Sequence, residues 1–189
     1  MSNSHTSHTK SIVATAFFAA IVYLGIQIFR IPLPAAVGTP FLHFGHIFVM
    51  LSVVCLGPKR SAIAGTLGLI IFDIINGYMH AIPNVFVLTI VKCFVVGFIF
   101  VILKKKAANN LKKEYGFAVI CAAIYGIINI VLDFSWTVAE LMIAGSTFQA
   151  AFAAEITSIP ATIINAVFTV VGIAVLYVPV TSAYKRVFK

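Results

Sequence analysis

The chain has 189 residues, of which 61% are hydrophobic and only 10% are charged. This composition excludes an ordinary soluble domain and indicates an integral membrane protein. A net charge of +8 would suit a nucleic-acid partner, but most basic residues lie in short runs beside apolar segments. The preference of Lys and Arg for the cytoplasmic side of membrane proteins explains such runs better than a nucleic-acid partner does. We therefore expect the chain to lie in a lipid membrane and to have no nucleic-acid partner.

Hydropathy predicts six membrane segments after a polar N-terminal tail of residues 1–10. They span about 11–29, 41–56, 61–77, 84–103, 115–142 and 152–180. No cleavage site of a signal peptide follows the first segment, so we expect this helix to be retained. The prediction is an all-α membrane protein in which residues 1–189 form one six-helix domain.

The first segment carries two small residues four positions apart, Ala16 and Ala20. Small residues at this spacing share one face of a helix and let a second helix approach closely. Such pairs are common in membrane helices, so the residues alone indicate only a candidate helix contact.

The stretch after the first segment, IPLPAAVGTP from Ile31 to Pro40, contains three prolines and a glycine. These residues exclude a continuous helix. His43 and His46 follow at a spacing that two metal ligands could use, but no third ligand stands at a fitting distance. Packing near the loop is the favoured interpretation of both histidines, and no metal is predicted.

A short basic turn, Gly57 to Arg60, separates the second and third segments, as is typical of the cytoplasmic side of a membrane. With both termini in the cytoplasm, eleven of the thirteen Lys and Arg residues lie inside, and only Arg30 and Lys92 do not. The predicted topology therefore has six spans and two cytoplasmic termini. The loops after the first, third and fifth segments then face outward.

Polar residues gather toward the predicted outer halves of the helices. On the fifth segment Asn129, Asp133, Trp136 and Glu140 have the spacing i, i+4, i+7, i+11, which places them on one stripe. The stripe must face the bundle interior, because two carboxylates in lipid are costly. We favour a ligand-lining role for it. The alternative is that Asp133 pairs with Lys92 and only holds helices together.

Lys92 lies near the middle of the fourth segment, so its ammonium needs a carboxylate or must lose its proton. Asp73 and Asp133 are the candidate partners. Trp136 fits equally a stack on a ring-shaped ligand and a place in the aromatic belt of the membrane surface, and Tyr78 also fits that belt. The predicted substrate-binding residues are Asp73, Asn76, Tyr78, Asn84, Lys92, Asn129, Asp133, Trp136 and Asn165.

The sequence offers little for catalysis. Its three cysteines lie inside apolar runs without metal-binding spacing, so neither a disulfide nor a metal site is predicted. Asp73, His80 and Glu140 are acid and base candidates, but no nucleophile or metal accompanies them. No nucleotide-binding loop of the GxxxxGK[ST] type is present, so energy from ATP would have to come from other subunits. We predict no enzyme activity, no catalytic residues and no cofactor.

Three motifs resemble a known family: HFGHIFVML from His43, LGPKRSAIAG from Leu56, and INGY from Ile75. They are similar to the substrate-binding (S) components of bacterial energy-coupling factor (ECF) vitamin transporters of the riboflavin type. The length and the number of predicted helices agree with that family.

The resemblance implies a six-helix subunit of the bacterial plasma membrane that binds a vitamin or its precursor tightly near the outer face. It implies a transmembrane scaffold (T) subunit and two ATP-binding cassette ATPases as partners. In the family an AxxxA motif on the first helix contacts the scaffold subunit, and Ala16 and Ala20 match it. The loop of residues 31–43 would act as a lid on the site.

The ligand is less directly indicated. Several family members have a glycine-rich fifth helix, whereas this chain has Tyr125, Gly126, Ile127, Ile128 and Asn129 there. A site with carboxylates suits a small ring better than a flavin, so we favour hydroxymethylpyrimidine or pyridoxine type compounds and place riboflavin next. A self-contained proton-coupled carrier, with Lys92 and Asp133 as a proton relay, is the alternative.

Overall fold

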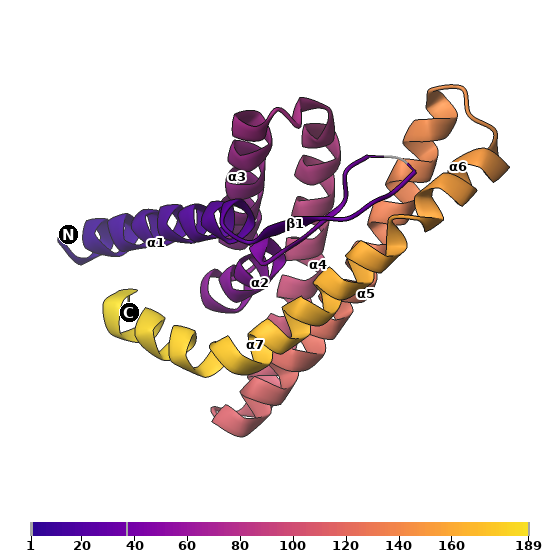
Figure 1. The fold of residues 1–189 in the computed structure, drawn as a ribbon. Coiled ribbons are helices and arrows are strands. Elements are labelled where there is room, and N and C mark those ends of the chain that lie inside the picture. Colours follow the sequence, from indigo (N-terminus) through magenta and orange to yellow (C-terminus); the bar gives the residue numbers. More distant parts are fainter. Residues whose placement is uncertain (1, 37, 189) are drawn as a thin grey trace.

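The computed structural model describes residues 2–36 and 38–188 (Figure 1). Most of these residues are helical, as predicted. In chain order the elements are α1 (Ser2–Gln27), β1 (Arg30–Pro32), β2 (Phe41–His43), α2 (Gly45–Leu56), α3 (Pro58–Asn76), the 3₁₀ helix η1 (Met79–Ala81), α4 (Ile82–Ala107), α5 (Leu111–Ile143), α6 (Phe148–Ile156) and α7 (Ile159–Phe188).

Four stretches of the described chain are long and apolar enough to cross a membrane: His8–Gln27 in α1, Met79–Ala107 in η1 and α4, the whole of α5, and the whole of α7. Helix α2 has 12 residues, so it is about 18 Å long and shorter than the hydrocarbon core of a bilayer. Helix α3 has 19 residues but begins with Lys59 and Arg60 in its first turn. The chain is thus a helical membrane protein with at least four helices suited to span the bilayer.

Two predicted boundaries need correction. Residues 2–10, expected to form a polar tail, are the first turns of α1. The predicted sixth segment, 152–180, is divided between two helices, α6 and α7, which are separated at Thr157 and Ser158. Pro160 accounts for the division, because proline lacks an N–H and fits the first turn of a helix rather than its interior.

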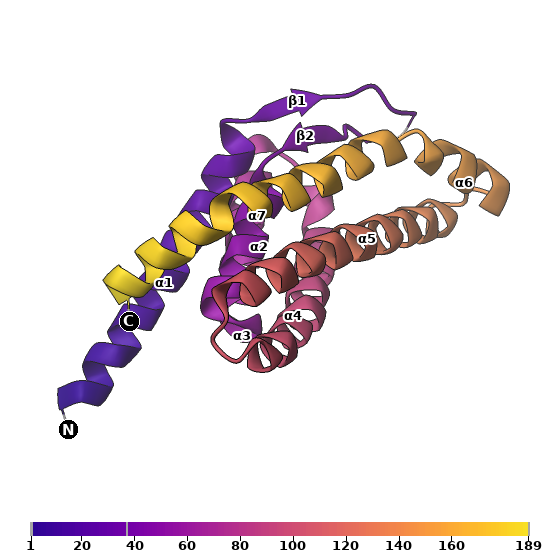
Figure 2. The ribbon, with the colours of Figure 1, turned by 90° about the horizontal axis from the view of Figure 1, so that it is seen from below.

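A short β-hairpin forms in the proline-rich stretch between α1 and α2. Strands β1 and β2 pair antiparallel, with Arg30 opposite His43 and Pro32 opposite Phe41. The prediction that no helix crosses this stretch is confirmed for its described residues, whereas the two strands are an addition to the predicted all-α fold. In Figure 2 the hairpin runs alongside α7 toward α6.

Helix α2 forms the centre of the core. Six consecutive residues, 49–54, are buried, so protein surrounds this helix on all sides. Helix α1 packs against α3, and α5 packs along α7 (Figures 1 and 2). Glycines permit both approaches: a Cβ on Gly68 would lie 2.6 Å from the carbonyl oxygen of Ala19, and one on Gly126 would lie 2.8 Å from the Cβ of Ala166.

The bundle has two ends of different character. Cys55 of α2, Lys104 of α4, Glu114 of α5 and Lys185 of α7 meet around one small cavity. We call this the basic end, because the turn at Lys59 and Arg60 and the run of lysines that closes α4 lie there as well. The opposite end, where α3, α5 and α6 finish and α4 and α7 begin, is called the pocket end.

Candidate functional site

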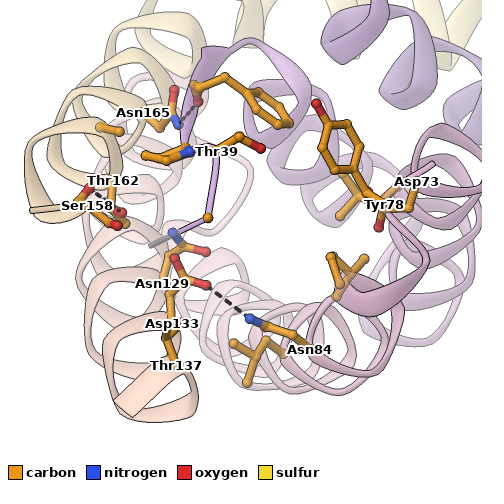
Figure 3. Close-up of a pocket in the computed structure, with 18 of the residues that line it drawn as sticks. Thr39, Asp73, Tyr78, Asn84, Asn129, Asp133, Thr137, Ser158, Thr162 and Asn165 are labelled. Carbon is orange, nitrogen blue, oxygen red and sulfur yellow. Dashed lines mark hydrogen bonds between the residues drawn. The ribbon is translucent and has the colours of Figure 1, made fainter. Parts of the chain in front are cut away.

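A large pocket opens at the pocket end, with a cavity volume of about 550 Å³. Cavities of this size are typical of small-molecule sites. Residues from the hairpin loop and from α1 to α7 line it, so the pocket exists only in the assembled fold. In Figure 3, Ser158, Thr162 and Asn165 lie on the side opposite Asp73 and Tyr78.

The predicted stripe on α5 forms one wall of the pocket. Asn129, Asp133, Thr137 and Glu140 all line it, while Trp136 does not and is half-buried elsewhere. Three residues on from Asp133, Trp136 is turned by about 60° around the helix axis from it. The face of α5 that is turned to the pocket is centred near Asp133 and Thr137, so Thr137 rather than Trp136 lies in the wall.

Lys92 of α4 also lines the pocket, and only 4% of its surface is exposed. Its ammonium donates a hydrogen bond to Oδ1 of Asn129 and lies 5.4 Å from the centre of the Tyr125 ring. Among the described residues, no carboxylate lies within 4.0 Å of the Lys92 ammonium. The ion pair that these residues do form joins Lys104 to Glu114. Asp133 instead accepts a hydrogen bond from Asn84 Nδ2 at 3.4 Å (Figure 3).

Aromatic rings close the side of the pocket next to α3. Tyr78 stacks on Phe72 with ring centres 5.9 Å apart, and Phe41 from β2 packs against both. Asp73 is buried beside these rings, and its Oδ2 atom has no hydrogen-bond partner among the described residues. The wall therefore has a flat apolar surface beside a buried carboxylate.

Asn165 fastens the hairpin to the pocket. Its Oδ1 accepts from the backbone N–H of His43 at 3.0 Å, and its Nδ2 donates to the carbonyl of Phe41 at 2.9 Å. The amide of Ala36 also donates to Oγ1 of Thr157 at 2.8 Å. These contacts place the described residues of the loop, 31–36 and 38–43, over the pocket, and residues 38–41 line it.

Three further residues that the sequence analysis considered, Asn76, His43 and His46, have contacts within the protein. Asn76 does not line the pocket: its side chain accepts from Arg30 at 3.2 Å and donates to Gln27 at 2.8 Å, which ties α1 to α3. His43 and His46 do line it, with ring centres 4.8 Å apart. Nδ1 of His43 accepts from the amide of Gly45.

Seven of the nine predicted binding residues line the pocket: Asp73, Tyr78, Asn84, Lys92, Asn129, Asp133 and Asn165. The prediction omitted several lining hydroxyls, among them Ser158 and Thr162. A signal for these two existed, because Ser158, Thr162 and Asn165 repeat at i, i+4 and i+7, the spacing of one helical face. Thr137 also carried a signal, because it follows Asn129 and Asp133 at i+8 and i+4, whereas Thr39 carried no comparable pattern.

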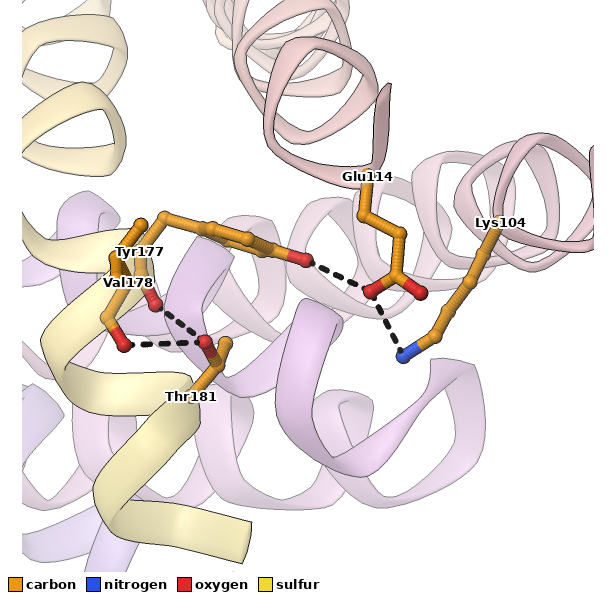
Figure 4. Close-up of polar contacts among 5 residues, drawn as sticks. All are labelled: Lys104, Glu114, Tyr177, Val178 and Thr181. Carbon is orange, nitrogen blue, oxygen red and sulfur yellow. Dashed lines mark hydrogen bonds and ion pairs between the residues drawn. The ribbon is translucent and has the colours of Figure 1, made fainter. Parts of the chain in front are cut away.

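A second polar group lies at the basic end and consists of Lys104, Glu114 and Tyr177. The Tyr177 hydroxyl donates to Oε2 of Glu114 at 3.3 Å, and Nζ of Lys104 lies 3.7 Å from the same oxygen (Figure 4). Thr181 donates to the carbonyl of Tyr177 at 2.6 Å. The cavity at this group measures only about 30 Å³, which leaves no room for an organic ligand. We refer to it as the Glu114 group.

Comparison with known families decides which protein class this pocket belongs to. The model of the ECF-type riboflavin transporter S component matches residues 6–186. The chain belongs to this family. No curated protein matches the sequence.

An ECF S component is a substrate-binding subunit of a transporter and not an enzyme. This chain is accordingly a multi-pass membrane protein of vitamin uptake. Family membership implies a vitamin as substrate, and T and ATPase subunits as partners.

Proposed function

We propose that this S component captures a small heteroaromatic vitamin or precursor in the pocket between α3, α4, α5 and α7. Hydroxymethylpyrimidine and pyridoxine type compounds are the favoured ligands, with riboflavin next. The captured molecule passes to the cell interior through the T subunit, driven by two ATP-binding cassette ATPases.

The observation that carries the proposal is a pocket of about 550 Å³ that combines polar side chains with an aromatic pair. Its polar lining includes Asn84, Lys92, Asn129, Asp133 and Asn165. These side chains can form hydrogen bonds with the edge of a ring-shaped ligand. Tyr78 and Phe72, which stack on each other, can accept its flat face.

The lining favours a small polar ring. The α5 and α7 walls offer amide, hydroxyl and carboxylate groups at successive turns. Hydroxymethyl groups and ring nitrogens can satisfy such groups by direct hydrogen bonds.

The proposed topology has six membrane passes with both termini in the bacterial cytoplasm. The basic end then faces the cytoplasm, in agreement with the preference of Lys and Arg for that side. The pocket end faces outward, where the vitamin arrives, and the loop of residues 31–43 serves as its lid. Helices α2 and α3 complete the six passes even though α2 is short.

The proposed contact with the T subunit lies on α1. Ala16 and Ala20 are exposed, while Ala14, Phe18 and Val22 of the same helix are buried in the core. The two alanines are therefore free to receive another helix at close range.

Mass spectrometry of small molecules extracted from the purified, detergent-solubilised chain tests the proposal. We expect one pyrimidine, pyridine or flavin vitamin in near-stoichiometric amount. An extract that stays empty after incubation with a panel of these vitamins would contradict the capture role. Concentrative uptake by the chain alone, abolished by dissipating the proton gradient, would favour a proton-coupled carrier instead.

A further inference from the structure

The pocket collects nearly all of the chain's negative charge. The sequence contains five Asp and Glu residues, and four of them line the cavity: Asp73, Asp133, Glu140 and Glu155. Among the described Lys and Arg residues, Lys92 is the one that lines it. A protein with a net charge of +8 thus presents its carboxylates to the ligand.

The two signs of charge lie at different depths. Lys92 is ten residues after Ile82, the first residue of α4, and so lies about 15 Å along the helix from the pocket end. Glu140 is three residues before the end of α5, about 5 Å from that end. Asp73 and Glu155 are likewise within the last turn of α3 and α6. The ammonium is on the floor, and these three carboxylates are near the opening.

Asp133 lies between these levels. It is four residues closer to the pocket end than Asn129, about one helical turn above the floor. Its hydrogen bond comes from the neutral amide of Asn84 and not from Lys92. The carboxylate is therefore free of any cation within 4.0 Å among the described residues.

The ammonium on the floor is incompletely paired. An ammonium has three donors, and here one bonds to the neutral amide oxygen of Asn129 while the Tyr125 ring lies to one side. A buried cation is costly unless an anion or strong acceptors surround it. The floor is thus suited to an acidic or electron-rich oxygen of the ligand.

We propose that Lys92 and the carboxylates recognise opposite charges on one ligand, and this inference rests on the proposed function. Lys92 recognises an acidic ring hydroxyl, and Asp133 recognises a basic ring nitrogen. These two residues therefore determine the specificity of the pocket. The ligand class is then a hydroxypyridine that carries both groups, in preference to an uncharged pyrimidine or a flavin.

Calorimetric titration of the full-length chain in detergent tests this, with pyridoxine and 3-deoxypyridoxine as matched probes. Removing the hydroxyl should weaken binding to the wild type about tenfold or more. In Lys92→Met the two probes should bind with nearly equal affinity, and Lys92→Arg should restore part of the discrimination. An unchanged preference in a folded Lys92→Met would overturn the role of Lys92.

A second probe pair tests the other sign of charge. The phenol analogue of pyridoxine, in which CH replaces the ring nitrogen, should bind the wild type about tenfold more weakly. This difference should disappear in Asp133→Asn. If Lys92→Met does not fold, the comparison of probes on the wild type still decides, because equal affinity for all three compounds would overturn the proposal.

Failure of this inference is separable from failure of the proposed function. Tighter binding of riboflavin or 4-amino-5-hydroxymethyl-2-methylpyrimidine than of pyridoxine would overturn the charge-recognition proposal and leave the capture role intact. No saturable binding of any of these compounds by folded protein would overturn both.

Discussion

The pocket and the Glu114 group bury the same kinds of side chain in opposite ways. At the basic end Glu114 has Tyr177 and Lys104 as partners, and the cavity is about 30 Å³. At the pocket end Lys92 bonds to a neutral amide, Asp73 keeps an unpaired oxygen, and the cavity is about 550 Å³. Polar groups that hold a fold together satisfy one another, whereas those that receive a ligand are left incomplete until it binds.

The largest effect is expected at a surface that belongs to neither region. Ala16→Phe should nearly abolish vitamin uptake by the assembled transporter, because a bulky ring on the exposed face of α1 blocks close helix contact. Binding of vitamin by the isolated chain should stay unchanged, since Ala16 does not line the pocket. Uptake and binding are measured in proteoliposomes and by calorimetry.

Ala123→Phe is the matched control, because Ala123 is also an exposed alanine but lies on α5. It should preserve uptake. Equal loss of uptake and binding in Ala16→Phe would mean that the alanine packs within the subunit.

Asp133→Asn tests whether a polar side chain of the pocket binds the ligand. Asparagine keeps an oxygen that can accept from Asn84 but removes the charge. A hydrogen bond to a charged group contributes about 1.5–3 kcal/mol, so the affinity for pyridoxine should fall about 10- to 100-fold with little change in stability. Titration calorimetry and thermal unfolding in detergent give both quantities. Unchanged affinity with poorer folding would mean that Asp133, like Glu114, stabilises the fold and does not bind the ligand.

Lys92→Met should raise the stability of the empty protein. Methionine has a similar length and no charge to bury, and a buried cation without an anion beside it is costly. We expect a gain of about 2 kcal/mol in the free energy of unfolding in mixed micelles. A loss of similar size would show that Lys92 is already satisfied, and the contrast between the two regions would fail.

Glu114→Gln tests the other side of the comparison. The substitution removes a buried charge that Tyr177 and Lys104 share, so we expect a loss of about 1–2 kcal/mol in unfolding free energy. Lys104 adds little to this figure because its side chain is 39% exposed. Affinity for the vitamin should not change. A clear loss of affinity in the folded variant would indicate that the two ends are coupled.

The positions of the long helices were predictable because an apolar run of membrane length rarely occurs outside a membrane-spanning helix. The hairpin was missed, since each strand has three residues and depends on contacts with Asn165 far along the chain. The break between α6 and α7 could have been predicted from Pro160. Hydropathy averages over a long window and does not register one proline.

The site was predictable as far as helical periodicity reaches. Asn129 and Asp133 were correctly placed on a pocket-facing stripe, but the period alone does not fix where its centre lies, and so Trp136 was included and Thr137 omitted. Asn76 was predicted to contact the ligand because the sequence does not reveal its partners. These are Gln27 of α1 and Arg30 of β1, which lie far from Asn76 along the chain. Glu114 went unnoticed because the lysines around it made its surroundings look like an exposed loop.

The smallest effect, from Tyr177→Phe, separates the two contributions to the Glu114 group. It removes one hydroxyl and leaves the ring, the charge of Glu114 and Lys104 in place. Hydrogen bonds between membrane helices average about 0.6 kcal/mol, so the loss of stability should be near that value.

Tyr115→Phe is the control, because its hydroxyl bonds to a backbone carbonyl, that of Ala174. In the double variant Glu114→Gln, Tyr177→Phe the losses should be less than additive. Full additivity would show that Tyr177 and Glu114 stabilise the basic end independently and that the group is not one unit.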